Sequence, residues 1–327
     1  MIHGRRVLIT GGGGFIGAAL AETLHPSNEI LLYDIRFDQN SAAYANLKDR
    51  PNIRFIQGDI LDKRRLKEAC RGAHIVVHLA SVVGVQTVIM NALRTLEVNV
   101  QGVQNILEIL NPSTTERFVY ISSSEIYGPD AYNAGESDNA VSGPPDDPRW
   151  SYAASKIVGE HMTQGHYQER GLPAVIVRPF NLFGPKRIGD HAVMRFIFQA
   201  LNHDPITVHN DGSAIRSWCY IDDFIDGLLR AATTEEAVGQ AFNIGNPANT
   251  VTMLQLARAV IQACNSSSRI EFVPFKHSDV HLRSPNISRA RSVLGYEPEA
   301  CLDEALSETA RWYRQHAAQI APRLLAP

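Results

Sequence analysis

The stretch Thr10-Gly11-Gly12-Gly13-Gly14-Phe15-Ile16-Gly17 decides the fold, because it joins an apolar run directly to a segment with helical periodicity. Gly11, Gly14 and Gly17 form a GxxGxxG spacing. Without side chains at these positions, backbone amides and the start of a helix can approach a pyrophosphate. The stretch therefore predicts a strand, a tight turn and a helix that together bind a dinucleotide.

The same alternation of strand and helix continues along the first half of the chain. Short apolar runs lie at residues 7–10, 30–33, 53–57, 75–79, 117–121 and 174–178, and helical periodicity covers 15–24, 63–70, 98–110 and 152–170. Such alternation predicts an α/β fold with a doubly wound parallel sheet of the Rossmann type. After residue 180 the pattern loosens, with helices expected at 193–201, 222–232 and 302–316 and a strand at 206–208. We therefore expect a Rossmann domain over residues 1–180 and a smaller C-terminal substrate-binding lobe over residues 181–327, with some later segments returning to the sheet.

The composition excludes several classes of protein. A net charge of -3 among 327 residues gives no broad positive surface for nucleic acid. No run approaches the ~18 apolar residues of a membrane span, and the N-terminus has no signal-peptide core. The four cysteines are scattered, without a metal-ligand spacing: Cys70, Cys219, Cys264 and Cys301. We expect a cytoplasmic protein with reduced thiols and no metal.

Acidic and small residues at later strand ends extend the predicted dinucleotide site. Asp34 ends the second strand, where a carboxylate can accept hydrogen bonds from ribose hydroxyls and repel a 2'-phosphate. This position favours NAD over NADP, although Arg36 can weaken the preference. Asp59 and Ile60 follow the third strand at the place of an adenine contact, while Asp59 is equally suited to cap a helix. Leu79 and Ala80 follow the fourth strand, beside the expected pyrophosphate.

A YxxxK element provides the candidate catalytic pair. Tyr152 and Lys156 are one helical turn apart and lie on one helix face. The ammonium and the positive nicotinamide of the oxidised cofactor favour the tyrosine phenolate, which can then remove a proton from a sugar hydroxyl. Ser124 and Glu125 follow the strand at 117–121, where the hydroxyl can orient the substrate alcohol. Glu125 is a candidate base for a carbon acid, or else a structural carboxylate.

These motifs resemble those of the extended short-chain dehydrogenases/reductases, the NAD-dependent nucleotide-sugar epimerases, dehydratases and decarboxylases. The resemblance extends from Gly11 to the motif at residues 294–296. It implies that Tyr152 is the base, that Lys156 binds the nicotinamide ribose and that Ser124 binds the hydroxyl being oxidised. It also implies a mainly structural role for Asn99 beside the cofactor.

The resemblance extends to the second lobe and implies a nucleoside diphosphate sugar as substrate, UDP being the commonest nucleotide. Asn181 lies in the segment Arg178-Pro179-Phe180-Asn181-Leu182-Phe183-Gly184-Pro185, which contacts substrate in the family. Arg216 and Arg283 are at positions that contact phosphate, and Arg195 can add a third charge. Guanidinium groups suit phosphates because they form paired, charge-assisted hydrogen bonds. Family dimers pair through two helices, here 98–110 and 152–170, so a homodimer is expected.

The fate of the 4-keto sugar separates the possible reactions. Ser124 replaces the aspartate of the 4,6-dehydratases. Glu125, the segment Pro148-Arg149-Trp150 and Arg283 resemble the UDP-glucuronate decarboxylases, in which the arginine can lie near the departing carboxylate. Decarboxylation is therefore the favoured reading. A UDP-sugar 4-epimerase, a 5,6-dehydratase with Glu125 as C5 base, and a non-catalytic NAD-binding sensor remain open as alternatives.

Overall fold

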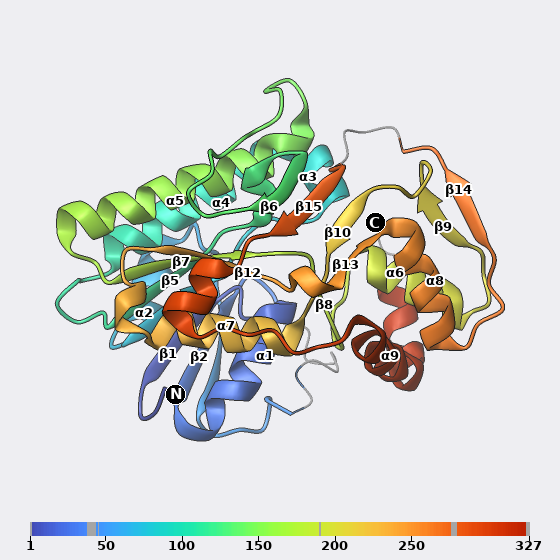
Figure 1. The fold of residues 1–327 in the computed structure, drawn as a ribbon. Coiled ribbons are helices and arrows are strands. Elements are labelled where there is room, and N and C mark those ends of the chain that lie inside the picture. The colour runs from blue at the N-terminus through green and yellow to red at the C-terminus, as the bar shows by residue number, and fades with distance from the viewer. Residues whose placement is uncertain (1, 38–43, 45, 190, 276–279, 325–327) are drawn as a thin grey trace.

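The larger lobe contains a sheet of seven parallel strands. The computed structural model describes residues 2–37, 44, 46–189, 191–275 and 280–324 (Figure 1). The strand order is β3-β2-β1-β4-β5-β7-β12, which confirms the predicted Rossmann-like class. The strands are β1 (Arg6–Thr10), β2 (Glu29–Asp34), β3 (Ile53–Gln57), β4 (Ile75–His78), β5 (Arg117–Ile121), β7 (Ala174–Pro179) and β12 (Ala241–Ile244).

Helices cover both faces of this sheet, and β1 shows why. Val7 and Ile9 pack in the same core cluster as residues of α1 and α7, whereas Leu8 packs with residues of α2 and α4. Because successive strand residues point to opposite faces, a strand buried on both sides needs a continuous apolar run. The covering helices are α1 (Phe15–Leu24), α2 (Lys63–Cys70), α4 (Ala92–Ile109), α5 (Ser151–Arg170) and α7 (Ile221–Thr233), and the short α3 (Val85–Met90) precedes α4.

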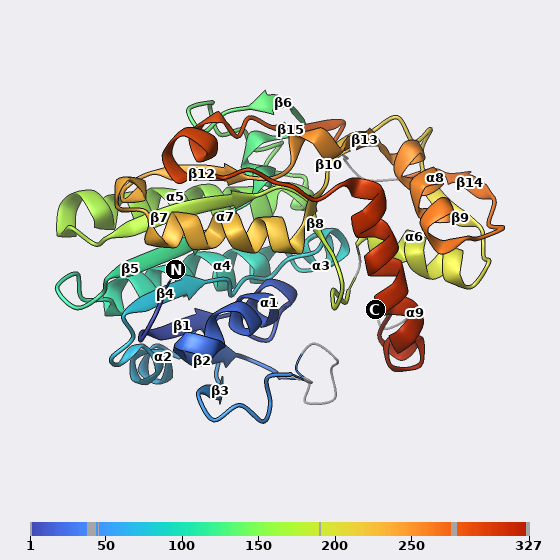
Figure 2. The same cartoon turned by 60° about the horizontal axis from the view of Figure 1, so that its bottom comes forward.

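The smaller lobe combines α-helices with short strands (Figure 2). Its helices are α6 (Ala192–Leu201), α8 (Met253–Cys264) and α9 (Leu302–Leu324). Its sheet has the order β13-β10-β15-β6, built from β13 (Thr250–Thr252), β10 (Ile215–Ser217), β15 (Leu282–Pro285) and β6 (Asp130–Ala134). Two further pairs join β8 (Leu182–Phe183) to β11 (Cys219–Tyr220) and β9 (Ile206–His209) to β14 (Ile270–Val273).

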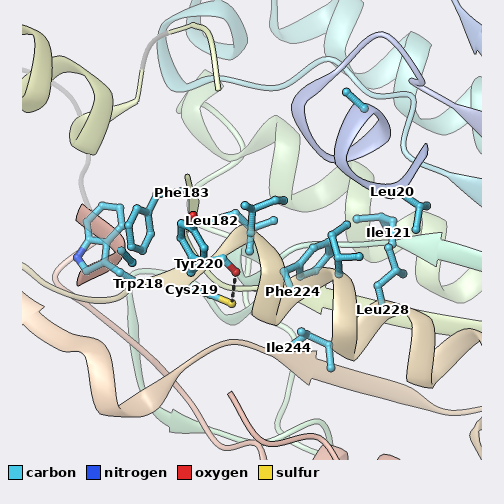
Figure 3. Close-up of a cluster of buried hydrophobic side chains, with 14 of the residues drawn as sticks. Leu20, Ile121, Leu182, Phe183, Trp218, Cys219, Tyr220, Phe224, Leu228 and Ile244 are labelled. Carbon is cyan, nitrogen blue, oxygen red and sulfur yellow. Dashed lines mark hydrogen bonds between the residues drawn. The ribbon is translucent and has the colours of Figure 1, made fainter. Parts of the chain in front are cut away.

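The chain passes between the lobes more than once. β6 precedes residue 180 but pairs with β15 of the smaller lobe, and β12 follows it but pairs with β7 of the large sheet. Two strands therefore lie across the expected division at residue 180. One hydrophobic core continues from Phe224 of α7 to the smaller lobe, where Trp218 and Tyr220 both pack against Phe183 (Figure 3). None of the helices in the described part of the chain has the length and apolar character that a membrane crossing requires.

Candidate active site

A single large cleft brings the predicted residues together. It lies where the order of the large sheet reverses between β1 and β4, and its volume is about 1570 Å³. Every residue predicted for cofactor, substrate or catalysis lines it, except Asn99. Asn99 instead accepts a hydrogen bond from the Val82 backbone N–H (2.7 Å) and donates one to Ser155 Oγ (3.0 Å). Since Val82 lines the cleft, Asn99 fixes the segment after β4, in agreement with a structural role.

The glycines of the turn have different roles, since Gly11 is packed against the chain and Gly14 faces the cleft. Gly11 has a φ of 71°, and a β-carbon there would lie 2.6 Å from the Ala80 nitrogen. Gly14 precedes α1, and a β-carbon there would meet only the Gly11 oxygen, at 3.3 Å, so the space beyond it belongs to the cleft. No side chain caps α1. The first amides of this helix therefore face the cleft without an intrahelical partner, which is the arrangement that binds phosphate.

Two carboxylates line the same side of the cleft. Asp34 accepts hydrogen bonds from the backbone N–H groups of Gly13 (2.8 Å) and Arg36 (3.2 Å), and burial raises its pKa. Asp59 accepts from the Leu61 N–H (2.9 Å) and lies 3.7 Å from Arg94. Asp59 thus stabilises the turn before α2 and lines the cleft, whereas the N-cap of that helix is Asp62 and not Asp59.

Tyr152 and Lys156 lie on α5 with their side chains in the cleft. Lys156 Nζ donates to the Ile121 carbonyl (2.8 Å) and lies 5.6 Å from the centre of the Tyr152 ring. Burial raises the pKa of Tyr152 to about 12 and lowers that of Lys156 to about 7. The expectation that the neighbouring ammonium favours the phenolate is therefore not met by the chain alone, because burial and then the nearby Glu125 carboxylate both raise the pKa of Tyr152.

The structure adds Ser123 and Ser81 to the catalytic group. Hydrogen bonding to both hydroxyls lowers the pKa of Tyr152 against the effect of burial. Ser123 also accepts from the Glu125 N–H (3.1 Å) and caps the short helix that begins at Ser124. Ser124 is buried and lines the cleft, but the structure puts Ser123 beside the phenol. Because residues 122–124 are all serines, the N-cap preference of serine does not show from the sequence which of them faces the phenol.

Glu125 lies between two arginines that come from distant segments. Arg149 Nη1 is 2.8 Å from one carboxylate oxygen, and Arg283 Nη1 donates to the other. Arg283 also donates to the Gly128 carbonyl (2.8 Å). Burial would raise the pKa of Glu125, but Arg283 and Arg149 hold it at about 2. A carboxylate held ionised by two arginines is a weak base, so the ion pairs favour the structural role of Glu125 over the role as a C5 base, the two alternatives that the sequence left open.

The remaining predicted residues enter the cleft from the smaller lobe. Asn181, with a φ of 34°, donates from Nδ2 to the Ser217 carbonyl (2.9 Å). Arg216 on β10 lies opposite Arg283 on β15, so the two arginines are strand neighbours. Arg195 lies on α6 and also lines the cleft. The cleft thus has a side of backbone amides and carboxylates and a side rich in guanidinium groups.

Comparison with known proteins identifies the family. The model of the NAD dependent epimerase/dehydratase family matches residues 7–245. This chain belongs to that family. The UDP-N-acetyl-alpha-D-glucosaminuronate decarboxylase of Bacillus cytotoxicus is 32% identical, over 95% of this chain and 98% of that protein. UDP-glucuronic acid decarboxylase 1 of Arabidopsis thaliana is 31% identical, over 92% of this chain and 68% of that protein.

Solved structures agree with this assignment. The UDP-glucuronic acid 4-epimerase of Bacillus cereus, in complex with UDP-glucuronic acid and NAD, has a TM-score of 0.87 and 27% identity, covering 95% of this chain and 99% of that one. Like its relatives, this chain is an NAD-dependent nucleotide-sugar enzyme of the epimerase/dehydratase family. The cleft fits NAD, because Gly14 leaves space at the start of α1 and Asp34 offers acceptors at the end of β2.

Proposed function

We propose that this enzyme removes carbon dioxide from a UDP-linked hexuronate through a 4-keto intermediate. The observation that supports this is the cluster of Glu125, Arg149 and Arg283 near Tyr152. Two guanidinium groups share one carboxylate, which leaves a net positive charge for the carboxylate of a uronate. The named activities of the Bacillus cytotoxicus and Arabidopsis relatives support the same reaction.

The residues around Tyr152 can perform the first step. Bound NAD supplies the hydride acceptor for C4 and a positive ring that favours the Tyr152 phenolate. Tyr152 takes the proton of the C4 hydroxyl, and Ser123 orients that hydroxyl, because its own hydroxyl is hydrogen-bonded to the phenol. Ser124, the residue expected from the sequence, remains a second candidate for this contact. Lys156, fixed by the Ile121 carbonyl, binds the nicotinamide ribose.

The second step then needs little further catalysis. A 4-ketouronate is a β-keto acid, so the C5–C6 bond breaks with its electrons moving to the C4 oxygen and carbon dioxide leaving. Arg283 and Arg149 orient the carboxylate, while Glu125 offsets part of their charge and limits how strongly they stabilise the uronate before reaction. Protonated Tyr152 lies next to the C4 oxygen from which it took the proton and can stabilise the enolate there. C5 then takes a proton from water, C4 regains the hydride that it gave up, and the C4 oxygen regains the proton from Tyr152. The product is therefore the UDP-linked pentose, lighter than the uronate by one carbon dioxide.

A 4-epimerase is the second candidate, supported by the likeness to the Bacillus cereus enzyme. This reaction uses the same Tyr152 step and a ketone that turns within the cleft. 5,6-dehydration is less well supported, because it needs a C5 base and Glu125 is ion-paired to two arginines. The non-catalytic sensor has no support, since Tyr152 and Lys156 are both placed in the cleft.

Mass spectrometry of the products distinguishes these reactions. The purified protein is incubated with NAD and, separately, UDP-glucuronate, its 2-acetamido analogue, UDP-glucose and UDP-galactose. We expect either uronate to lose one carbon dioxide and the neutral sugars to keep their mass. A uronate product of unchanged mass but altered chromatographic retention would contradict decarboxylation and establish epimerisation.

Substrate contacts, assembly and location complete the proposal. Asn181, Arg195 and Arg216 bind the nucleoside diphosphate of the substrate. The homodimer forms through α4 and α5, where Leu93 is 71% and Val158 39% exposed, large values for apolar side chains on neighbouring helices. All four cysteines are free thiols, which suits a cytoplasmic location.

A further inference from the structure

Arg187 connects the smaller lobe to the glycine turn of the larger one. It lies in the loop between β8 and α6 and lines the cleft. Its guanidinium carbon is 5.4 Å from the centre of the ring of Phe15, the first residue of α1. A cation from the smaller lobe therefore lies at the helix end where backbone amides face the cleft.

The loop that positions Arg187 is anchored on several sides. Arg187 Nη1 donates to the Leu182 carbonyl (3.2 Å), and the Arg187 carbonyl accepts from the Tyr313 hydroxyl of α9. The preceding residue, Lys186, forms an ion pair with Glu22 of α1, with an Nζ–Oε2 distance of 2.6 Å. Lys186 also has a φ of 70°, a conformation that non-glycine residues rarely adopt and that clusters at functional sites.

The charge of Arg187 has no carboxylate counter-ion among the residues that the structure describes. Burial lowers the pKa of Arg187 to about 10, against the smaller opposite effect of the phenols of Tyr313 and Tyr152. Phe15 covers one face of the guanidinium. A partly buried cation without an acidic partner is unfavourable unless a ligand supplies an anion.

Among the described residues that line the cleft beside the glycine turn, the larger lobe contributes no cation that lacks a carboxylate partner. The turn itself contributes glycines and the apolar Phe15 and Ile16. The charged groups next to it are the carboxylates Asp34 and Asp59, and Arg94 lies 3.7 Å from Asp59. The diphosphate of a dinucleotide has two negative charges, which backbone dipoles alone only partly offset.

We propose that Arg187 binds the diphosphate of NAD, so that the smaller lobe supplies the cation of the dinucleotide site. The inference rests on the family's use of NAD and does not depend on which sugar nucleotide is turned over. It adds to the glycine turn a contact that closes the site from the opposite lobe. A substrate diphosphate has the same chemistry, so the test must separate the two sources.

Titration calorimetry with four ligands makes this separation. NAD and ADP-ribose contain the cofactor diphosphate, adenosine lacks it, and UDP represents the substrate. The full-length protein is freed of retained cofactor and compared with Arg187→Met, Arg187→Lys and the control Arg258→Met, which removes an exposed arginine of α8. We expect Arg187→Met to weaken the binding of NAD and ADP-ribose about tenfold or more, which is the scale of one charge-assisted hydrogen bond. Arg187→Lys should weaken their binding less. The affinities for adenosine and UDP should change less than about threefold, a difference small enough to count their sites as unaltered.

Two results would overturn the proposal. One is unchanged NAD and ADP-ribose affinity in Arg187→Met, and the other is weakened UDP binding with unchanged NAD binding, which would assign Arg187 to the substrate. Thermal unfolding of each variant verifies folding. If Arg187→Met does not fold, the ratio of ADP-ribose to adenosine affinity in Arg187→Lys decides, because a lost diphosphate contact lowers that ratio and a general loss of structure does not.

Discussion

The two sides of the cleft bind by different physical means. On the cofactor side, missing side chains and backbone amides form the site, with Gly11, Gly14 and the start of α1 as its main parts. On the sugar side, charged side chains form ion pairs with one another. The pair of Glu125 with Arg283 joins residues 158 positions apart in the sequence. The first kind of site depends on local backbone shape, whereas the second depends on the completed fold.

This difference predicts how each side responds to substitution. On the sugar side, removing the Glu125 charge leaves two buried arginines without their shared counter-ion, so stability should fall. The same change should tighten uronate binding before reaction, because Glu125 no longer offsets the charge of the arginines. On the cofactor side, adding a methyl group should lower the stability of the fold only where other protein atoms already fill the space. Tyr152 lies between the two sides, and its substitution should affect neither kind of binding.

The largest effect is expected for Tyr152→Phe. Without the phenol oxygen the C4 proton has no acceptor, and turnover should fall by about 10³-fold or more, toward the upper range for general base catalysis. NAD and UDP affinities should remain near normal, because the ring still fills its place on α5. Steady-state kinetics and calorimetry on the same preparation test this. Turnover within tenfold of the unaltered enzyme would remove Tyr152 from the mechanism.

Glu125→Gln should have the next largest effect, on stability and on uronate binding. It leaves Arg149 and Arg283 without their shared carboxylate, at a cost of about 3 kcal/mol in the free energy of unfolding. The low folded-state pKa of about 2 means that this contribution is present above the ordinary glutamate pKa and is lost as the pH falls toward 2. Urea unfolding between pH 3 and 7 should therefore show a smaller pH dependence in the variant.

A surface glutamate provides the control for this result. Glu68 on α2 lies 3.9 Å from Arg64, and both side chains are exposed. Glu68→Gln should change the unfolding free energy by less than about 0.5 kcal/mol. If Glu125→Gln is equally mild while decarboxylation stops, Glu125 is a catalytic base or acid, and its role as a positioning residue is wrong.

The sequence predicted the cofactor side better than the sugar side. Strand and helix periodicity located the six strands from β1 to β7 in the large sheet, because each period is local. The partners of Glu125 could not be deduced, since Arg149 and Arg283 approach it only through tertiary structure. Ser123 was missed because three consecutive serines follow β5, where strand alternation no longer decides which hydroxyl faces the phenol.

The smallest and most selective effects are expected for two glycines of the turn. Gly11→Ala would put a β-carbon 2.6 Å from the Ala80 nitrogen at a φ of 71°, so we expect a loss of about 2–4 kcal/mol in unfolding free energy. Gly14→Ala meets only the Gly11 oxygen at 3.3 Å and should cost less than about 1 kcal/mol. Its methyl group occupies cleft space, so NAD affinity should fall about tenfold while UDP affinity stays unchanged.

Denaturant unfolding without ligand, followed by NAD and UDP titration, separates these two roles. If Gly14→Ala destabilises the fold as much as Gly11→Ala, both glycines serve packing and the opening at α1 is not the diphosphate site. If Gly14→Ala weakens UDP as well as NAD, the two sides of the cleft are coupled. In that case the backbone-built and charge-built sites would form one binding unit, with the Arg187 loop as the physical link between them, because it contacts α1 through both Phe15 and Glu22.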